Sequence, residues 1–136
     1  GRRLNDSMGD YVASQVVKLM IKKGITINGA SLLMLGITFK ENCPDVRNTK
    51  IVDLIKAVED YGISVSLYDP WANPVEVLHE YGLRTHHQPP SATFDAIVLG
   101  VAHQEFLDLD LASLRKSNSV VYDVKGVLGD LADGRL

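Results

Sequence analysis

The residues best suited to chemistry lie in one short stretch, GITFKENCPDVRNTK, which spans positions 36–50. It holds the only cysteine of the chain, Cys43, among several acidic and basic residues. A thiol acts as a nucleophile in its thiolate form, which needs a neighbouring base or positive surroundings. The adjacent acids oppose that form, although His103 follows a strand expected to end at the same edge of the sheet, so a Cys–His pair is geometrically conceivable. A catalytic cysteine is therefore the less favoured interpretation.

The same stretch offers two cations for binding phosphate groups, Lys40 and Arg47. The dinucleotide-binding pattern G-x-G-x-x-G is missing, because only Gly36 lies in this turn. We therefore expect no NAD bound in the usual Rossmann manner, and phosphate contacts made by side chains. Lys40 would supply a mobile point charge and Arg47 a rigid bidentate fork. The alternative is that both cations pair with Glu41 and Asp45 and only order the loop.

Other polar residues have simpler interpretations. Neighbouring side chains on a strand point apart, so His86 and His87 are expected in a solvated loop and not as a metal-binding pair. Trp71 follows an Asp-Pro turn and is expected to anchor that turn by packing, with stacking on a base as the alternative. Asp108 and Asp110 are interpreted as helix caps. The sequence predicts no metal site.

Length and composition limit the class of protein. The 136 residues, 46% of them hydrophobic, suit one folded domain with its own core. The formal net charge is −3 and both signs are interspersed, which argues against a nucleic-acid partner. We find no signal-peptide pattern and no apolar run near the roughly 20 residues that span a bilayer. A single cysteine indicates a reducing cytoplasm. Since the chain opens with Gly-Arg-Arg, we expect a piece of a longer protein.

The first 24 residues predict one helix. Asn5 or Asp6 is expected to cap its start, and Lys22, Lys23 and Gly24 to end it. Its apolar face recurs at steps of three and four residues: Val12, Val16, Val17, Leu19, Met20 and Ile21. No strand is an obvious partner, so we expect this helix to pack on another chain or on a preceding domain.

After this helix, apolar strands alternate with amphipathic helices. The expected strands are 31–39, 63–69, 83–85, 94–103 and 119–126, and the expected helices are 50–62, 74–81 and 109–116. Such alternation predicts right-handed βαβ crossovers. The fold class is therefore α/β, a doubly wound Rossmann-like parallel sheet of about five or six strands preceded by one N-terminal helix. Ligands of such sheets bind beyond the carboxyl ends of the strands, here the loops 40–48, 69–73 and 102–106.

A close resemblance to the C-terminal domain of the UDP-glucose/GDP-mannose dehydrogenase family is carried by LGITFKENCPDVRNTKIVDLIKAVEDYGISVSLYDPWANP. It includes the F-K…D-x-R loop and the Y-D-P turn, and continues through GVAHQEF, YDVKGVL and DGRL. It implies that residues 30–136 form a nucleotide-sugar-binding domain. Residues 1–29 resemble the end of the family's central dimerisation helix and its linker. The loop is most similar to the branch that oxidises UDP-N-acetylhexosamines for bacterial capsule, Vi-antigen or O-antigen polysaccharides.

The resemblance implies roles for four residues of the loop. Lys40 matches the lysine that reaches the nucleotide sugar, and Phe39 is expected to border the same substrate site. Arg47 matches the arginine that reaches across the cleft to NAD. Asp45 is expected to hold that arginine in position.

The resemblance also implies the reaction and the partners of the whole enzyme. An N-terminal domain of the same chain would hold the cofactor NAD, and the central helix would form a homodimer. The C6 alcohol of the UDP-sugar would become a carboxylate by two hydride transfers, through a thiohemiacetal on the cysteine of a G-G-x-C motif. This sequence lacks that motif, so we expect an active parent enzyme and an inactive fragment. Arg2, Arg3 and Asn5 match helix positions near the cleft, without an assigned contact.

Three alternatives stay open from the sequence. The parent could be a UDP-glucose or GDP-mannose dehydrogenase of the same family. The chain could be a freestanding α/β binding or docking module, although a receiver-like regulator would need clustered acids where this sequence has Lys40. It could also serve mainly in assembly, through the helix at 7–23.

Overall fold

The computed structural model of the chain describes the backbone of residues 2–136 and the side chains from residue 8 onwards. The helices are α1 (Arg2–Lys22), α2 (Ile51–Asp60), α3 (Pro74–Tyr81) and α4 (Gln104–Leu107), with 3-10 turns at Leu111–Leu114 and Gly129–Leu131. The strands are β1 (Ser31–Leu35), β2 (Ser64–Tyr68), β3 (Thr85–His86), β4 (Phe94–Leu99), β5 (Arg115–Asp123) and β6 (Gly134–Arg135).

All strands of the sheet run parallel, in the order β3-β2-β1-β4-β5-β6. This is the strand order of the Rossmann fold, in which the chain changes direction between the first and the fourth strand. The predicted fold class is therefore confirmed, with a sheet of six strands preceded by one helix. The switch point lies between β1 and β4.

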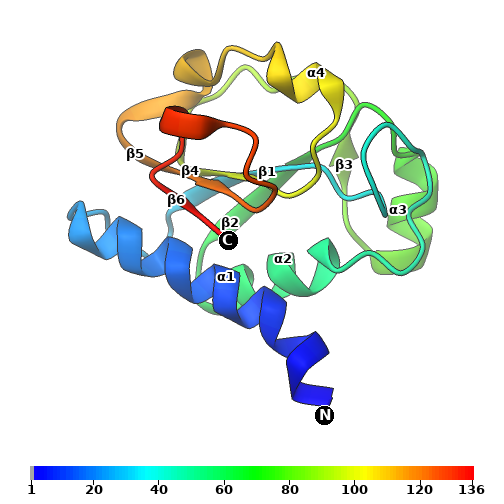
Figure 1. Cartoon of the computed structure of the whole chain (residues 1–136), viewed down its shortest axis with the longest axis horizontal. Helices are drawn as coiled ribbons and strands as arrows, with labels where there is room; N and C mark the ends of the chain where they lie inside the picture. The colour runs from blue at the N-terminus through cyan, green and yellow to red at the C-terminus, as the bar shows by residue number, and fades with distance from the viewer. Residues whose placement is uncertain (1) are drawn as a thin grey trace.

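The sheet separates two apolar layers (Figure 1). Helices α1 and α2 cover one face, and α4 with the turn after it covers the other. Because both faces are covered, β1 is buried along almost its whole length and consists of apolar residues without alternation. Within residues 2–136, no helix is both long enough and apolar enough to cross a membrane.

Two glycines end β1 and β4 at the switch point. Strand β1 stops at Leu35 and not at residue 39, because Gly36 turns the chain with a φ of +95°. A Cβ added to Gly36 would lie 2.6 Å from the Cβ of Val101. Gly100 directly follows β4, next to the end of β1, and donates its N–H to the carbonyl of Leu35 at 2.9 Å. The bare backbone at Gly36 thus lets the two loops meet closely.

Helix α1 packs on its own chain, which corrects the expectation of an external partner for its apolar face. Val12, Val16 and Met20 are fully buried in the core shared with α2 and the sheet. Lys23, just after the helix, donates to the carbonyl of Ser119 on β5 at 2.6 Å. The predicted helix end is confirmed.

Two details of the predicted helix are wrong. Ile21 belongs to the outer side, with 60% of its surface exposed. Asn5 and Asp6 lie inside α1, which begins at Arg2, so neither is the residue before its first turn.

The segment after β4 also differs from the prediction. A single helix at 109–116 is replaced by the short α4 and a 3-10 turn, and β5 already begins at Arg115. Asp110 precedes the 3-10 turn without a side-chain capping bond, and Asp108 follows α4, so the predicted caps are wrong. The helix expected at 50–62 is shorter in the structure, since α2 ends at Asp60 and Tyr61, which follows it, is 44% exposed.

Candidate functional site

The β1–α2 loop, residues 36–50, folds back on itself at the carboxyl edge of the sheet. The backbone N–H of Phe39 donates to the carbonyl of Asp45 at 2.7 Å, and the Thr38 hydroxyl donates to the carbonyl of Lys40 at 2.9 Å. These bonds close the loop locally and leave the side chains of Phe39 and Lys40 exposed.

Arg47 and Asp45 form a bidentate ion pair on this loop. Nε of Arg47 lies 3.0 Å from Oδ1 of Asp45, and a terminal nitrogen lies 3.1 Å from Oδ2. These side-chain bonds, with one from the Arg47 backbone N–H, lower the pKa of Asp45 from 3.8 to about 2. The Arg47 side chain is 81% exposed, so its remaining N–H groups face solvent. The pair orders the loop and at the same time presents a guanidinium edge.

Asp69, directly after β2, is the buried acceptor that joins the three loops of this edge. Its carboxylate accepts backbone N–H groups at 2.7, 3.3, 2.8 and 3.1 Å from Ile37, Thr38, Trp71 and Ala72. Nε2 of His103 lies 3.1 Å from Oδ2. Burial by itself raises the pKa of Asp69, but the bonds from His103 and from the backbone outweigh it and hold the pKa below its ordinary value.

His103 is fully buried beside Asp69, and its partners identify its tautomer. Nδ1 lies 2.9 Å from the backbone nitrogen of Asn42, which can only donate, so Nδ1 accepts. Nε2 lies 3.1 Å from Oδ2 of Asp69 and 3.1 Å from the Thr38 hydroxyl, whose hydrogen already goes to the carbonyl of Lys40. Nε2 therefore carries the hydrogen and the ring is neutral.

Trp71 and Asn42 make further contacts around His103 that hold the same loops together. The Trp71 ring stacks on His103 with 6.0 Å between centroids, and its Nε1 donates to Glu105 at 2.9 Å. Asn42 accepts the backbone N–H of Gln104 on its Oδ1 at 3.0 Å. Trp71 thus acts as the packing anchor that the sequence indicated.

A cavity of about 280 Å³ opens beside the loop, at the switch point between β1 and β4. Phe39 and Val101 contribute apolar wall, and the exposed Lys50 and Lys125 contribute positive charge. The N-terminus of α2 also lies in the lining, where the N-cap residue Lys50 makes no side-chain capping bond and the Thr49 hydroxyl accepts the N–H of Ile51 at 3.1 Å. Free N–H groups at a helix start carry partial positive charge, so the cavity combines an apolar wall with attraction for anions.

The predicted site residues lie on different sides of the loop. Phe39 lines the switch-point cavity, with Lys40 exposed next to it in the chain. Arg47, Asp45 and Cys43 line a separate, open depression of about 550 Å³ that faces α3. The loop therefore presents two surfaces instead of one.

A Cys–His pair is contradicted by the hydrogen bonds around His103. Both of its ring nitrogens are engaged with other groups, so it has no free nitrogen to act as a base for Cys43. His86 and His87 are exposed, and among the described residues no group of three or more His, Cys, Asp or Glu could hold a metal ion. The side chains of residues 2, 3 and 5, mentioned above, lie outside the described ones.

The sequence reasoning missed Asp69, Lys50 and Lys125 at this edge, and considered His103 only as a partner for Cys43. Lys125 follows β5, whose loop was not counted among the three at the carboxyl edge. A usable signal was present, because the pair Tyr-Asp recurs at the ends of two strands: Asp69 directly follows Tyr68, the last residue of β2, and Asp123 is the last residue of β5. Each of these aspartates is fully buried and accepts backbone N–H groups of the loop that follows it, Asp123 from Lys125 at 3.0 Å.

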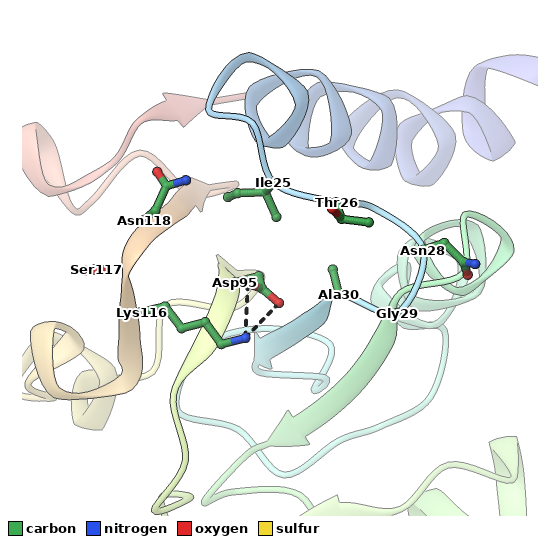
Figure 2. Close-up of a pocket in the computed structure, with 9 residues that line it drawn as sticks. All are labelled: Ile25, Thr26, Asn28, Gly29, Ala30, Asp95, Lys116, Ser117 and Asn118. Carbon is green, nitrogen blue, oxygen red and sulfur yellow. Dashed lines mark hydrogen bonds and ion pairs between the residues drawn. The ribbon is translucent and has the colours of Figure 1, made fainter.

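A second cavity, of about 440 Å³, lies at the opposite edge of the sheet. Figure 2 shows Lys116 pointing into it toward Asp95, with which it forms an ion pair at 3.2 Å. Asp95 also accepts the backbone N–H of Ser31 at 2.9 Å. These groups satisfy one another, and ligands of open parallel sheets bind at the other edge. The switch-point cavity is therefore the candidate ligand site.

Comparison with known proteins identifies the family. Residues 33–130 match the sequence profile described as "UDP-glucose/GDP-mannose dehydrogenase family, UDP binding domain". The chain belongs to the UDP-glucose/GDP-mannose dehydrogenase family. The resemblance inferred from the F-K…D-x-R loop is thereby confirmed.

Relatives in this family carry names that specify a sugar. Over its whole length the chain is 46% identical to a UDP-N-acetyl-D-glucosamine 6-dehydrogenase of Pseudomonas aeruginosa and 47% identical to one of Salmonella typhi. It is 37% identical over 94% of its length to Protein CapL of Staphylococcus aureus. The chain spans about a third of each of these relatives, at 33%, 33% and 31% of their lengths.

Solved structures of the family share the fold. A UDP-D-ManNAc dehydrogenase from Pyrococcus horikoshii superposes with a TM-score of 0.76 at 19% identity, over 98% of this chain and 31% of that one. An NDP-N-acetyl-D-galactosaminuronic acid dehydrogenase from Methanosarcina mazei gives a TM-score of 0.76 at 24% identity, over 90% of this chain and 26% of that one. At these identities the match concerns the fold alone.

Proposed function

We propose that this chain is the C-terminal, UDP-sugar-binding part of an NAD-dependent UDP-N-acetylhexosamine 6-dehydrogenase that acts in bacterial surface polysaccharide synthesis in the cytoplasm. Residues 30–136 form the binding domain, and residues 1–29 form the end of a central helix and its linker. The switch-point cavity, in a chain of this family, is the observation that carries the proposal. The names of the relatives at 46% and 47% identity favour an N-acetylhexosamine over glucose or mannose.

The size of the cavity supports binding of part of a nucleotide sugar. Its volume of about 280 Å³ falls just below the roughly 300–1,000 Å³ of complete small-molecule sites. We assign Phe39 to the apolar part of the ligand, and Lys40, Lys50 and Lys125 to its diphosphate. The remainder of the ligand is then covered by the N-terminal domain of the same protein.

The turn after β1 does not build a pyrophosphate cradle for NAD. The space above Gly36 is occupied by Val101, so the glycine serves close packing of two loops and not the approach of a phosphate. We assign only Arg47, positioned by Asp45, to contact NAD from this side, and the main NAD site to the N-terminal domain. When bound, NAD accepts the hydride from the sugar. The fragment alone is inactive because the reactive cysteine belongs to the other part.

A homodimer through the central helix is also part of the proposal. The outer side of α1 keeps large apolar side chains exposed, Tyr11 at 51% and Ile21 at 60%. Burial of both side chains against a second copy would favour such an interface.

Calorimetric titration of the 136-residue chain with UDP tests the binding site. We expect binding that weakens about tenfold in Lys125→Ala, the loss of one charge-assisted hydrogen bond. The matched control is Lys18→Ala, which removes an exposed lysine on α1 away from the cavity. Equal affinity of Lys125→Ala and Lys18→Ala for UDP would contradict the assignment.

Turnover of the full-length protein tests the reaction. We expect NADH formation with UDP-N-acetylglucosamine and NAD, and none when the 136-residue chain replaces the full-length protein. Faster turnover of UDP-glucose or GDP-mannose would assign the protein to another branch of the family. NADH formation by the 136-residue chain would refute the inactive fragment.

A further inference from the structure

The β1–α2 loop is held to the sheet by one buried imidazole. His103 accepts the backbone N–H of Asn42 at 2.9 Å through Nδ1, in the middle of the loop that carries Lys40 and Arg47. The loop also reaches back to the helix after His103, because Asn42 accepts the N–H of Gln104 at 3.0 Å. Nothing in the proposed reaction requires a buried histidine at this place, so its role needs a separate account.

The loop conformation depends on this contact. Asn42 adopts a φ of +54°, in the left-handed region that costs a residue with a side chain about 1–2 kcal/mol. Asparagine tolerates this region better than most residues, but the conformation persists only where neighbouring groups hold it. The two hydrogen bonds of Asn42 to the segment at 103–104 are those groups.

A second proton on His103 cannot coexist with this arrangement. Nε2 already carries a hydrogen, which points toward Asp69 and the Thr38 hydroxyl. The added proton would sit on Nδ1 and face the N–H of Asn42, so two hydrogens would meet where one hydrogen bond stood. Asp69 would attract the cationic ring, but from the side of Nε2, and cannot repair the contact at Nδ1.

Few other charges act on this imidazole. On the elements around it, the titratable side chains are Asp69 and Tyr68 at the end of β2 and Glu105 on α4. Glu105 is bound to Nε1 of Trp71. In the loop itself, Lys40 and Glu41 are exposed. In the structure none of these side chains is hydrogen-bonded to Nδ1, whose partner is the backbone N–H of Asn42.

We propose that His103, oriented by Asp69, is a positioning residue that holds the β1–α2 loop in its ligand-binding conformation only while the imidazole is neutral. The loss of binding on acidification rests on the proposed function, since it requires that Lys40 and Phe39 contact the UDP moiety. The tautomer and the loop conformation do not rest on it. Binding of UDP therefore weakens as His103 takes up a proton, while the fold of the sheet remains.

Two substitutions test the roles of the two ring nitrogens of His103 separately. His103→Asn places an amide oxygen near the position of Nδ1, so it keeps an acceptor for Asn42 that does not titrate. His103→Gln places its amide near the position of Nε2, so it keeps a donor to Asp69 and loses the acceptor. We expect the UDP affinity of the unsubstituted chain to fall about tenfold as acidification adds a proton to His103. His103→Asn should bind with a flatter pH profile, and His103→Gln should bind weakly throughout.

NMR of the ligand-free, unsubstituted chain gives a readout that needs neither variant nor ligand. We expect the ¹⁵N signals of His103 to report the Nε2–H tautomer near neutral pH, and the amide signal of Asn42 to move together with protonation of His103. An Nδ1–H tautomer, or an Asn42 amide that ignores this protonation, would overturn the inference. An unchanged pH profile in a folded His103→Asn would do the same. If UDP fails to bind at any pH while the NMR result holds, the proposed function fails and the positioning role stands.

Discussion

Arg47 and Asp45 are joined by two side-chain hydrogen bonds of 3.0 and 3.1 Å, with a third bond of 2.9 Å from the Arg47 backbone N–H to the same carboxylate. The pair lies at the surface, on the side of the β1–α2 loop that faces α3. The two parallel side-chain bonds are the bidentate arrangement of a guanidinium and a carboxylate. At an exposed site this arrangement fixes the orientation of the Arg47 side chain but contributes little to stability.

The first prediction concerns the ionisation of this pair. The pKa of Asp45 is lowered from 3.8 to about 2, so whatever stability the pair contributes is present above 3.8 and is lost as the pH falls toward 2. In Arg47→Gln, we expect the pKa of Asp45 to return part of the way toward 3.8, since only the backbone bond remains. A carboxyl-carbon NMR titration of both chains measures this. An Asp45 pKa that is the same in both would show that Arg47 is not the cause.

A second prediction concerns the close approach at the switch point. Gly36→Ala places a Cβ 2.6 Å from Val101 and also strains a φ of +95°. We expect a loss of about 2–5 kcal/mol in the free energy of unfolding, from overpacking plus left-handed strain. Gly29→Ala is the control, because its φ is +88° and nothing lies within 4 Å of the added Cβ. It should cost about 1–2 kcal/mol. If urea denaturation shows the same loss of unfolding free energy in Gly36→Ala and Gly29→Ala, a clash with Val101 does not contribute.

The third prediction tests whether α1 is part of this domain. Met20 is fully buried and Ile21, the next residue, is 60% exposed. We expect Met20→Ala to lower the free energy of unfolding of the isolated chain by about 2–5 kcal/mol, through lost burial and a cavity. Ile21→Ala should change it by about 0.5 kcal/mol or less. If both variants unfold at the same urea concentration as the unsubstituted chain, α1 does not pack on the sheet in solution.

The fourth prediction concerns Cys43. Its position in the depression beside Asp45, and the engagement of both nitrogens of His103, give it no base. We expect Cys43→Ser to bind UDP within about twofold of the unsubstituted chain, as for a surface substitution worth about 0.5 kcal/mol or less. We also expect the same substitution to leave turnover of the full-length protein largely intact. Loss of turnover in Cys43→Ser would mean that the cysteine takes part in the reaction.

Much of the fold followed from local patterns. Continuous apolar runs predicted β1 and β4, and a helix was predicted at the same 74–81 that α3 occupies, because a buried parallel strand and an amphipathic helix differ in periodicity. Short elements were placed less accurately. Strand β3 was expected at 83–85 and lies at Thr85–His86, whereas the two-residue β6 was not expected. The run around Leu111 is too short to separate a helix from a 3-10 turn.

The sequence alone also determined that the loop at 36–50 is polar, lies after the first strand and lacks a glycine cradle, since each of these depends on residue type and order. It did not determine which of those residues share a surface. Phe39 and Arg47 lie on different sides of the loop, and Lys125 joins Phe39 from a strand far away in the chain.

Only the tertiary structure decided the roles of Asp69 and His103. Taken alone, each is a polar residue after a strand, and the local bonds of Asp69 to the N–H groups of Trp71 and Ala72 do not reveal its contact with His103. They become a buried pair because parallel strands bring β2 and β4 to one edge, with β1 between them. Burial removes water as a competing partner, so the backbone N–H groups of the loops must find their acceptors on these two side chains.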